Sequence, residues 1–293
     1  MIDNLSTGSI DNISHLTDNP NFTFVQDTIM NEKVLEELIR NCDIVYHLAA
    51  AVGVKYIVEN TLDSMLTNVL GTEIILRSAH KEKKKVLLVS SSEVYGKNGT
   101  PPQKETDDRL LGPSSVPIWS YASSKIVNEY MGQSYCREKN LPVIMVRLFN
   151  TIGPRQTGAY GMVVPRFVKQ ALSNEPITVY GDGNQTRSFI YVKDVVTALI
   201  LLGNNENAVG EIFNVGNTRE TRIMDLALLV KNIATSKSEI ICKPYEELYD
   251  SRFEDVARRV PDITKIREFT GWQPVTPLEK AVSEAINSLK KNS

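Results

Sequence analysis

The chain contains a short, unbroken apolar run that ends in three serines: Val86-Leu87-Leu88-Val89, followed by Ser90-Ser91-Ser92. Unbroken apolar runs of this length are typical of strands that are buried on both faces of a parallel sheet. An open parallel sheet places its ligands outside the carboxyl ends of its strands. The run therefore predicts an α/β fold with a ligand site close to the serines.

Apolar runs and helical patterns alternate through the first half of the chain. Repeated alternation of this kind predicts a doubly wound parallel sheet. The expected strands cover residues 22–25, 44–48, 86–90 and 143–149, and the expected helices cover residues 31–41, 62–80 and 121–139.

The regular alternation of apolar runs and helical patterns ends after Asn150, where loops rich in glycine and proline begin. We expect residues 1–150 to form the sheet domain and residues 151–293 to form mainly a smaller α/β lobe, with residues 188–216 packing back on the sheet. In the smaller lobe the expected helices cover residues 164–173, 194–202 and 278–289, and the expected strand covers residues 176–180.

A tyrosine and a lysine stand four residues apart in the stretch Tyr121-Ala122-Ser123-Ser124-Lys125. Residues at this spacing lie on one face of a helix, so the ammonium can approach the phenol and favour its ionised form. The pattern predicts that Tyr121 is a general base near neutral pH. A solvated lysine beside a packed ring would produce the same pattern, and the nearby serine-ended strand is what favours the catalytic interpretation.

The whole composition excludes several classes of protein. The 293 residues are 42% hydrophobic and 23% charged, with a formal net charge of −2, which is ordinary for a globular protein and gives no basic footprint for nucleic acid. No apolar run approaches the roughly 20 residues of a membrane span. The three cysteines and three histidines show no metal-ligand or disulfide spacing, which favours a cytoplasmic protein without a metal site.

Several motifs in order resemble one known family. They are Asp3-Asn4-Leu5-Ser6-Thr7-Gly8, His47-Leu48-Ala49-Ala50, the serine strand through Gly96, the Tyr121/Lys125 pair, the stretch from Arg147 to Arg155, and the stretch from Val179 through Phe189. Together they resemble the extended short-chain dehydrogenase/reductases, and specifically the NAD-dependent nucleotide-sugar epimerases, dehydratases and decarboxylases. The resemblance implies a Rossmann-like NAD-binding domain followed by a substrate-binding lobe.

The start of the chain departs from the family pattern. A dinucleotide fold opens with a strand, a glycine-rich turn and a helix that holds the pyrophosphate. This sequence begins at the acidic residue that follows those elements, so Asp3 resembles the ribose-binding aspartate and GxxGxxG is absent. Two explanations stay open: an N-terminally truncated chain, or NAD held without its usual cradle. A missing central strand would also leave an exposed strand edge.

The resemblance assigns catalytic roles to five residues. Tyr121 would take the proton from the sugar C4 hydroxyl, Lys125 would lower the phenol pKa and hold the nicotinamide ribose, and Ser91 would bind the reacting oxygen. Ser92 and Glu93 stand where dehydratases carry an Asp-Glu pair, so dehydration is not expected. Ser-Ser-Glu-Val-Tyr-Gly instead resembles UDP-glucuronate decarboxylases, in which Glu93 would act on the C5 carboxylate; a capping glutamate at a strand end is the structural alternative.

The resemblance also implies two sets of binding residues. Those implied for NAD, besides Tyr121 and Lys125, are Asp3, Asn4, Ser6, Thr7, Gly8, Asp27, Thr28, Leu48, Ala49, Ala50, Thr67 and Thr151. Those implied for the UDP-sugar are Asn150, Thr178, Tyr180, Arg187, Arg258 and Arg259, of which Arg187 could hold either the carboxylate or the diphosphate. The sequence does not decide between Arg258 and Arg259.

Three functions remain open at this stage. The preferred one is a UDP-glucuronate decarboxylase that forms UDP-xylose through a 4-keto intermediate, and the second is a 4-epimerase of UDP-glucose or UDP-glucuronate. The third is a catalytically silent nucleotide-sugar-binding fragment. The amphipathic segments 62–80 and 121–139 resemble the family's dimer-forming helices, which implies a homodimer.

Overall fold

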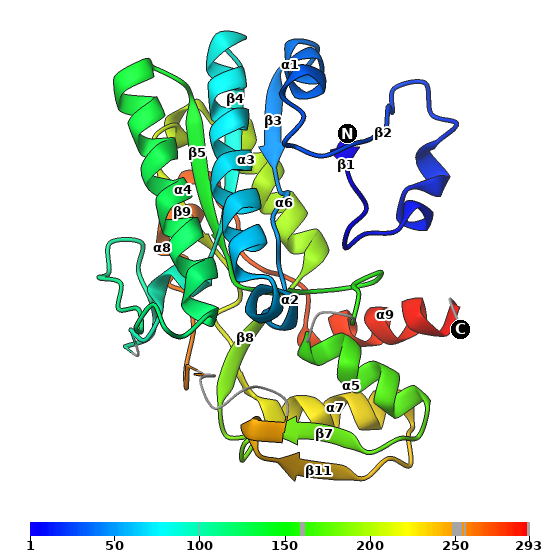
Figure 1. The fold of residues 1–293 in the computed structure, drawn as a ribbon. Coiled ribbons are helices and arrows are strands. Elements are labelled where there is room, and N and C mark those ends of the chain that lie inside the picture. Colours follow the sequence, from blue (N-terminus) through cyan, green and yellow to red (C-terminus); the bar gives the residue numbers. More distant parts are fainter. Residues whose placement is uncertain (99, 159–161, 248–253, 255, 292–293) are drawn as a thin grey trace.

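The computed structural model describes residues 1–98, 100–158, 162–247, 254 and 256–291, and Figure 1 shows its arrangement. A parallel sheet of four strands forms its centre, in the order β3-β4-β5-β9. These strands are β3 (Ile44–His47), β4 (Lys85–Ser91), β5 (Val143–Leu148) and β9 (Ile212–Val215). Their parallel pairing requires the crossover helices that the alternating sequence pattern predicted.

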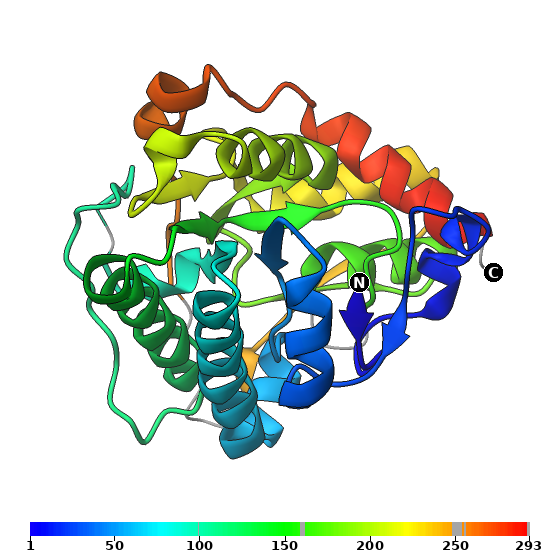
Figure 2. The same ribbon diagram turned by 90° about the horizontal axis from the view of Figure 1, so that it is seen from above.

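Alternate residues of the central strands pack into opposite layers, because successive side chains of a strand point to opposite faces. Val86 and Leu88 join a cluster with α1 (Glu32–Arg40) and α3 (Thr61–Lys81), whereas Leu87 joins a cluster with α6 (Val192–Gly203) and α8 (Thr264–Thr270). The long helix α4 (Ile118–Lys139) lies beside α3 on the first face, and α2 (Val54–Glu59) precedes α3. Both faces of the sheet are therefore covered, as Figure 2 shows, and the predicted doubly wound α/β class is confirmed.

The second half of the chain builds two smaller sheets below the central one in Figure 1. One has the order β10-β8-β6, and the other pairs β11 with β7. The strands are β6 (Asn150–Ile152), β7 (Ile177–Tyr180), β8 (Thr186–Tyr191), β10 (Glu220–Arg222) and β11 (Ile240–Lys243). The helices α5 (Val163–Leu172), α7 (Ile223–Ala234) and α9 (Leu278–Lys291) share one hydrophobic cluster with residues of β6, β7 and β8.

The first strands stand apart from the central sheet. β1 (Ile2–Asp3) pairs in parallel with β2 (Val25–Gln26), and the two form a sheet of their own, seen beside the main sheet in Figure 2. The short 3-10 helices η1 (Ile10–Asn12) and η2 (Ser14–Leu16) lie between them in sequence. Within the described part of the chain β3 pairs only with β4, so β3 is an edge strand.

The predicted elements differ from the observed ones mainly at their ends and in the short strands. The strand expected at 22–25 is wrong in position, since β2 covers only Val25–Gln26. The long helices begin up to three residues earlier than expected, and the sequence interpretation missed α2, α7, α8 and the strands β6 and β8–β11. The remaining 3-10 turns are η3 (Ser92–Tyr95), η4 (Glu206–Ala208) and η5 (Tyr245–Glu247).

Two further observations complete the fold. Residues 245–254 resemble an insertion relative to the family pattern, and residues 248–253 lie outside the described part of the chain. Among the helices that the structure describes, none combines the length and apolar character needed to cross a bilayer.

Candidate active site

The carboxyl end of β4 turns sharply into η3, and this turn exposes the serine hydroxyl that the sequence singled out. Ser91 is the N-cap of η3: its Oγ accepts a hydrogen bond from the backbone N–H of Glu93 at 3.2 Å. Ser92 is buried beneath the turn, and the backbone N–H of Gly96 bonds to the carbonyl of Glu93 and ends it. Serine is a favoured N-cap because its oxygen satisfies one of the free N–H groups of the first turn.

Helix α4 brings the tyrosine and the lysine to this strand end. Tyr121 lies in the first turn of α4 and shares a side-chain hydrogen bond with Ser91. Lys125 lies one turn later, with its Nζ 5.9 Å from the centroid of the Tyr121 ring. The ammonium donates a hydrogen bond to the carbonyl oxygen of Val89 at 3.0 Å. Ser91, Tyr121 and Lys125 therefore form one cluster at the edge where parallel sheets bind ligands.

The electrostatics of the phenol differ from the sequence prediction. Burial, and then the negative charge of Glu93, raise the pKa of Tyr121 well above its usual range, and the hydrogen bond from Ser91 opposes them only in part. The ammonium of Lys125 lies 5.9 Å from the centroid of the ring and donates its hydrogen bond to the carbonyl of Val89. These protein groups alone do not give Tyr121 the near-neutral pKa that the spacing predicted.

Lys125 is itself perturbed by its surroundings. Burial lowers its pKa from 10.5 to about 8, and the carboxylate of Glu129 partly offsets that effect. The same burial, together with the charge of Lys125, lowers the pKa of His47 to about 3. His47 is thus a neutral core residue, bonded through Nε2 to the hydroxyl of Thr72 at 2.9 Å.

Glu93 forms an ion pair with Arg259, which reaches the site from the second half of the chain. Arg259 is 4% exposed, and its Nε is a buried donor without a hydrogen-bond partner among the described residues. Its neighbour Arg258 pairs with Glu220 instead, at 2.7 and 2.8 Å, and its side chain is half exposed. Of the two arginines that the sequence left undecided, the structure brings only Arg259 to the catalytic cluster.

The other residues implied for the sugar lie on three strands. Asn150 begins β6, where it pairs in register with Phe189 of β8, and Arg187 on β8 donates to the carbonyl of Thr186 at 2.7 Å. Thr178 and Tyr180 lie on β7 in the smaller lobe. The hydroxyl of Thr178 accepts a bond from Gln170 at 3.2 Å, and the ring of Tyr180 lies between Tyr245 and Arg166.

The residues implied for NAD form tight local turns. Asp3 ends β1 and accepts the N–H of Leu5 at 2.7 Å, and Asn4 accepts the N–H of Ser6 at 3.0 Å. Thr7 is partly buried, and Gly8 would place a Cβ 4.0 Å from an Asp3 oxygen, so this turn closes on the aspartate.

The second turn formed by residues implied for NAD contains Asp27 and Thr28, just before the start of α1. Asp27 accepts bonds from the N–H of Thr28 and the amide of Asn31, both at 2.7 Å, while Thr28 accepts the N–H of Met30 at 3.2 Å. Both side chains are therefore occupied in forming the entry to the helix.

The remaining residues implied for NAD lie after β3, on α3 and on β6. Leu48 follows β3 with 56% of its surface exposed, and Ala49 is exposed while Ala50 is partly buried. Thr67 is partly buried on α3, and Thr151 donates to the carbonyl of Phe149 at 3.0 Å. Small residues after β3 leave room for a ligand to approach the backbone.

A buried carboxylate next to Lys125 is the residue that the sequence interpretation missed. Glu129 lies four residues beyond Lys125 on α4 and accepts hydrogen bonds from Ser90, Arg109 and Arg147. The signal that could have revealed it is the spacing, because residues 121, 125 and 129 follow one another at four-residue steps on one helix face.

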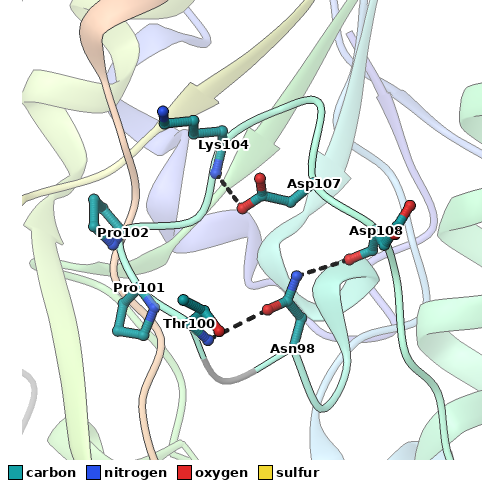
Figure 3. Close-up of a pocket in the computed structure, with 7 residues that line it drawn as sticks. All are labelled: Asn98, Thr100, Pro101, Pro102, Lys104, Asp107 and Asp108. Carbon is teal, nitrogen blue, oxygen red and sulfur yellow. Dashed lines mark hydrogen bonds between the residues drawn. The ribbon is translucent and has the colours of Figure 1, made fainter.

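Two surface pockets lie apart from the Ser91–Tyr121–Lys125 cluster. The pocket in Figure 3 has a volume of about 380 Å³ and is formed by a surface loop from Asn98 to Asp108, closed by bonds such as that from Asn98 to the carbonyl of Asp108. The second, of about 630 Å³, is lined in part by Glu220, Arg258 and Arg267. Arg258 is the only predicted site residue among those that line either pocket.

The sequence of residues 1–285 matches the family model described as GDP-mannose 4,6 dehydratase. The chain belongs to this family. The predicted resemblance to extended short-chain dehydrogenase/reductases that act on nucleotide sugars is thereby confirmed. The Rossmann-like interpretation of the fold agrees with this membership.

Curated relatives in the family are named as decarboxylases of UDP-uronates. The chain is 40% identical over 287 residues to UDP-N-acetyl-alpha-D-glucosaminuronate decarboxylase of Bacillus cytotoxicus, covering 98% of this chain and 88% of that protein. It is 35% identical over 291 residues to UDP-glucuronic acid decarboxylase 1 of Xenopus tropicalis, covering 99% of this chain. The chain spans 66% of the frog protein's length, slightly less than two thirds.

Solved structures in the same fold include two UDP-sugar 4-epimerases. UDP-glucose 4-epimerase of Thermotoga maritima, solved with UDP-glucose, superposes with a TM-score of 0.88 at 28% identity, covering 99% of this chain and 90% of that one. UDP-glucuronic acid 4-epimerase of Bacillus cereus, solved with UDP-glucuronic acid and NAD, gives 0.83 at 26% identity, covering 97% and 86%.

Proposed function

We propose that this family member is an NAD-dependent enzyme that modifies a UDP-sugar through a 4-keto intermediate, and that it decarboxylates UDP-glucuronate to UDP-xylose. The observation that carries the proposal is the Ser91–Tyr121–Lys125 cluster with Glu93 and Arg259 at its edge. Relatives named as UDP-uronate decarboxylases support the reaction.

The protein's own groups fit a bound NAD at the catalytic end. Lys125 is a buried donor beside Tyr121, and the exposed, small residues after β3 leave backbone accessible. Asp3 is partly buried at the end of β1, where an acidic residue would bind the adenosine ribose. The chemistry that NAD supplies when bound is the reversible acceptance of a hydride from the sugar C4.

Within this proposal Tyr121 removes the proton of the C4 hydroxyl, and Ser91 holds the same oxygen by a hydrogen bond. A positioned base of this kind contributes about 10²–10⁴-fold to the rate. Oxidation at C4 makes the sugar a β-keto acid, so the bond from C5 to its carboxylate can break with its electrons moving into an enolate. CO₂ leaves, a proton returns to C5, and reduction of the ketone restores the hydroxyl.

Glu93, Ser92 and Arg259 would act on the carboxylated end of the sugar. The Arg259 Nε is a buried donor that has no hydrogen-bond partner within the described part of the chain, and buried donors generally have one. An anionic group of the substrate, either its carboxylate or its diphosphate, would satisfy it. Binding would then compete with the Glu93–Arg259 ion pair and leave the Glu93 carboxylate facing C5.

The decisive experiment incubates the protein with NAD and UDP-glucuronate or its 2-acetamido analogue. We expect CO₂ and a UDP-pentose, or the corresponding acetamido sugar. Replacing Glu93 with alanine should stop CO₂ release and retain UDP-sugar binding. Glu254, which receives the indole N–H of Trp119, offers a matched control as Glu254→Ala. Unchanged CO₂ release in Glu93→Ala would remove Glu93 from the mechanism.

The second candidate is a UDP-sugar 4-epimerase, which the solved 4-epimerases of the same fold favour. Epimerisation needs only oxidation, rotation and re-reduction of the sugar, so Ser91, Tyr121 and Lys125 would suffice. A C4 epimer as product, without CO₂, would move the assignment to this reaction. Failure to retain or bind NAD, measured by nicotinamide absorbance, would favour a catalytically silent sugar-binding protein.

We further propose a cytoplasmic homodimer. All three cysteines are free, which suits a reducing compartment such as the cytoplasm.

The homodimer is supported by apolar side chains that are exposed on two neighbouring helices. They are Leu62, Met65, Leu66 and Leu70 on α3, and Val127 and Tyr130 on α4. Burying these faces together would remove a large apolar area from water. Light scattering should give twice the chain mass, and a Leu66→Glu variant should give the single mass; a monomeric wild type would refute the dimer.

A further inference from the structure

Glu129 is a buried carboxylate that receives four hydrogen bonds from three side chains. Ser90 Oγ donates to its Oε1 at 2.6 Å, and Arg147 donates to both oxygens at 3.0 and 2.9 Å. Arg109 adds a bond to Oε2 at 2.5 Å. The side chains of Glu129 and Arg147 are 2% and 1% exposed, so these charges interact in a medium that screens them weakly.

The network joins α4 to the strand that carries Ser91. Lys125 is bonded to the carbonyl of Val89, and the next residue, Ser90, is bonded to Glu129. Two successive turns of α4 are thus tied to two successive residues of β4. Ser91 follows directly, and Tyr121 lies one turn before Lys125, so these ties set the register in which the two hydroxyls meet.

The groups packed around Lys125 and Glu129 come from several elements. Tyr121 and Glu129 share the helix of Lys125, His47 faces it from β3 as a neutral imidazole, and Glu93 acts on Tyr121 from η3. Arg147 extends from β5 and Arg109 from the loop before α4, and both form ion pairs with Glu129. Glu129 is the carboxylate whose charge favours the protonated form of Lys125. Without it, burial would favour the neutral form of the lysine.

We propose that Glu129 is a positioning residue for the proposed reaction: its charge keeps Lys125 protonated beside Tyr121, and its bonds to Ser90 and Arg147 hold α4 in register with Ser91. Glu129 acts through Lys125 and does not touch the reacting atoms. Only the expected effect on turnover rests on the proposed function. The effect on the charge of Lys125 does not, because that charge can be measured without substrate.

The test follows the titration of Lys125 by NMR in protein labelled with ¹³C at the lysine Cε, with Lys125→Ala used to assign its signal. Glu129→Gln keeps the shape of the side chain and removes its charge, and it should lower the pKa of Lys125 by about one unit. Arg109→Gln removes a cation and should raise that pKa by a smaller amount. Ser90→Ala is the matched control, because it breaks a bond to Glu129 without changing any charge.

Opposite shifts in the two charge variants, with no shift in Ser90→Ala, would support the proposal. A Lys125 pKa that is equal in wild type, Glu129→Gln and Arg109→Gln would overturn it. Glu129→Gln leaves the buried Arg147 without its carboxylate partner, and this variant could unfold. Arg109→Gln, on the partly exposed side of the network, therefore keeps the test decisive, because an unshifted or lowered pKa of Lys125 in that variant refutes the proposal.

Turnover provides the second readout. The pH at which activity declines on the alkaline side should move down in Glu129→Gln and up in Arg109→Gln, with the KM for the UDP-sugar nearly unchanged. If the NMR shifts occur but wild-type protein converts no UDP-sugar, the proposed function fails while the role of Glu129 in holding the lysine charge stands. If UDP-sugar is converted but the shifts are missing, only the present proposal fails.

Discussion

The two sides of the candidate site are built in different ways. On the catalytic side, β4 and α4 are long elements whose polar residues are buried and bonded to residues far away in sequence, such as Ser90 to Glu129. On the cofactor side, β1 and β2 have two residues each, and Asp3 and Asp27 bond within their own turns. Catalytic geometry thus depends on the core of the domain, whereas the cofactor turns depend on local sequence.

The largest effect is expected on the catalytic side. Tyr121→Phe removes the hydroxyl that bonds to Ser91 and should reduce turnover by about 10²–10⁴-fold, because the proton acceptor is lost. The helix and its packing keep their shape, so NAD binding and the melting temperature should change little. Turnover is measured by activity assay, and NAD binding and the melting temperature are measured by calorimetry. If Tyr121→Phe keeps turnover within a factor of two or three of wild type, Tyr121 is not the base, and the catalytic side is no more sensitive than the cofactor side.

The next effect separates two adjacent arginines. Arg259→Met should weaken UDP-sugar binding by about tenfold or more, since a buried charged donor would be lost from the site. Arg258→Met is the matched control and should leave binding within a factor of two or three, because the half-exposed pair with Glu220 is screened by water. Titration calorimetry with the UDP-sugar measures both. Equal losses would contradict the assignment of Arg259 to the site.

A third prediction concerns pH. Burial lowers the pKa of Lys125 to about 8, so the ammonium predominates below pH 8 and is lost as the pH rises through that value. Turnover should therefore fall above about pH 8, and not near pH 10.5 as for an exposed lysine. A profile of kcat against pH measures the midpoint. Full activity at pH 10 would show that the charge of Lys125 is not needed.

The smallest effect is expected on the cofactor side. Asp3→Ala should weaken NAD binding by about tenfold, because a bond to the ribose is lost, and should leave kcat at saturating NAD nearly unchanged. Asp11, an exposed acid on η1 nearby in sequence, serves as the control in Asp11→Ala. Fluorescence titration with NAD gives the affinities. A large fall in kcat in Asp3→Ala would show that the two sides of the site are not independent.

Features with a local signature could be predicted from the sequence. The apolar run 86–89 predicted a strand, and the four-residue spacing of Tyr121 and Lys125 predicted a helix; both are observed. The two-residue strand β2 was misplaced because its exposed backbone gives too short a hydrophobic pattern.

Features that depend on tertiary contact could not be predicted. Nothing local distinguishes Arg258 from Arg259, and only the folded chain shows which one faces Glu93. The bonds of Glu129 join residues 18 to 39 positions apart, so the four-residue spacing that places Glu129 on the face of Lys125 does not show which side chains bind it. The raised pKa of Tyr121 likewise comes from burial, which the four-residue spacing does not report.

The hydrogen bond from Lys125 to the carbonyl of Val89 has a consequence for which substitutions the protein tolerates. Its acceptor is a main-chain carbonyl, which every amino acid at position 89 would supply equally. A substitution at position 89 can alter packing, but it cannot remove the carbonyl oxygen that accepts the hydrogen bond from Lys125. A library randomised at this codon should retain many working members, whereas one randomised at codon 125 should retain almost none.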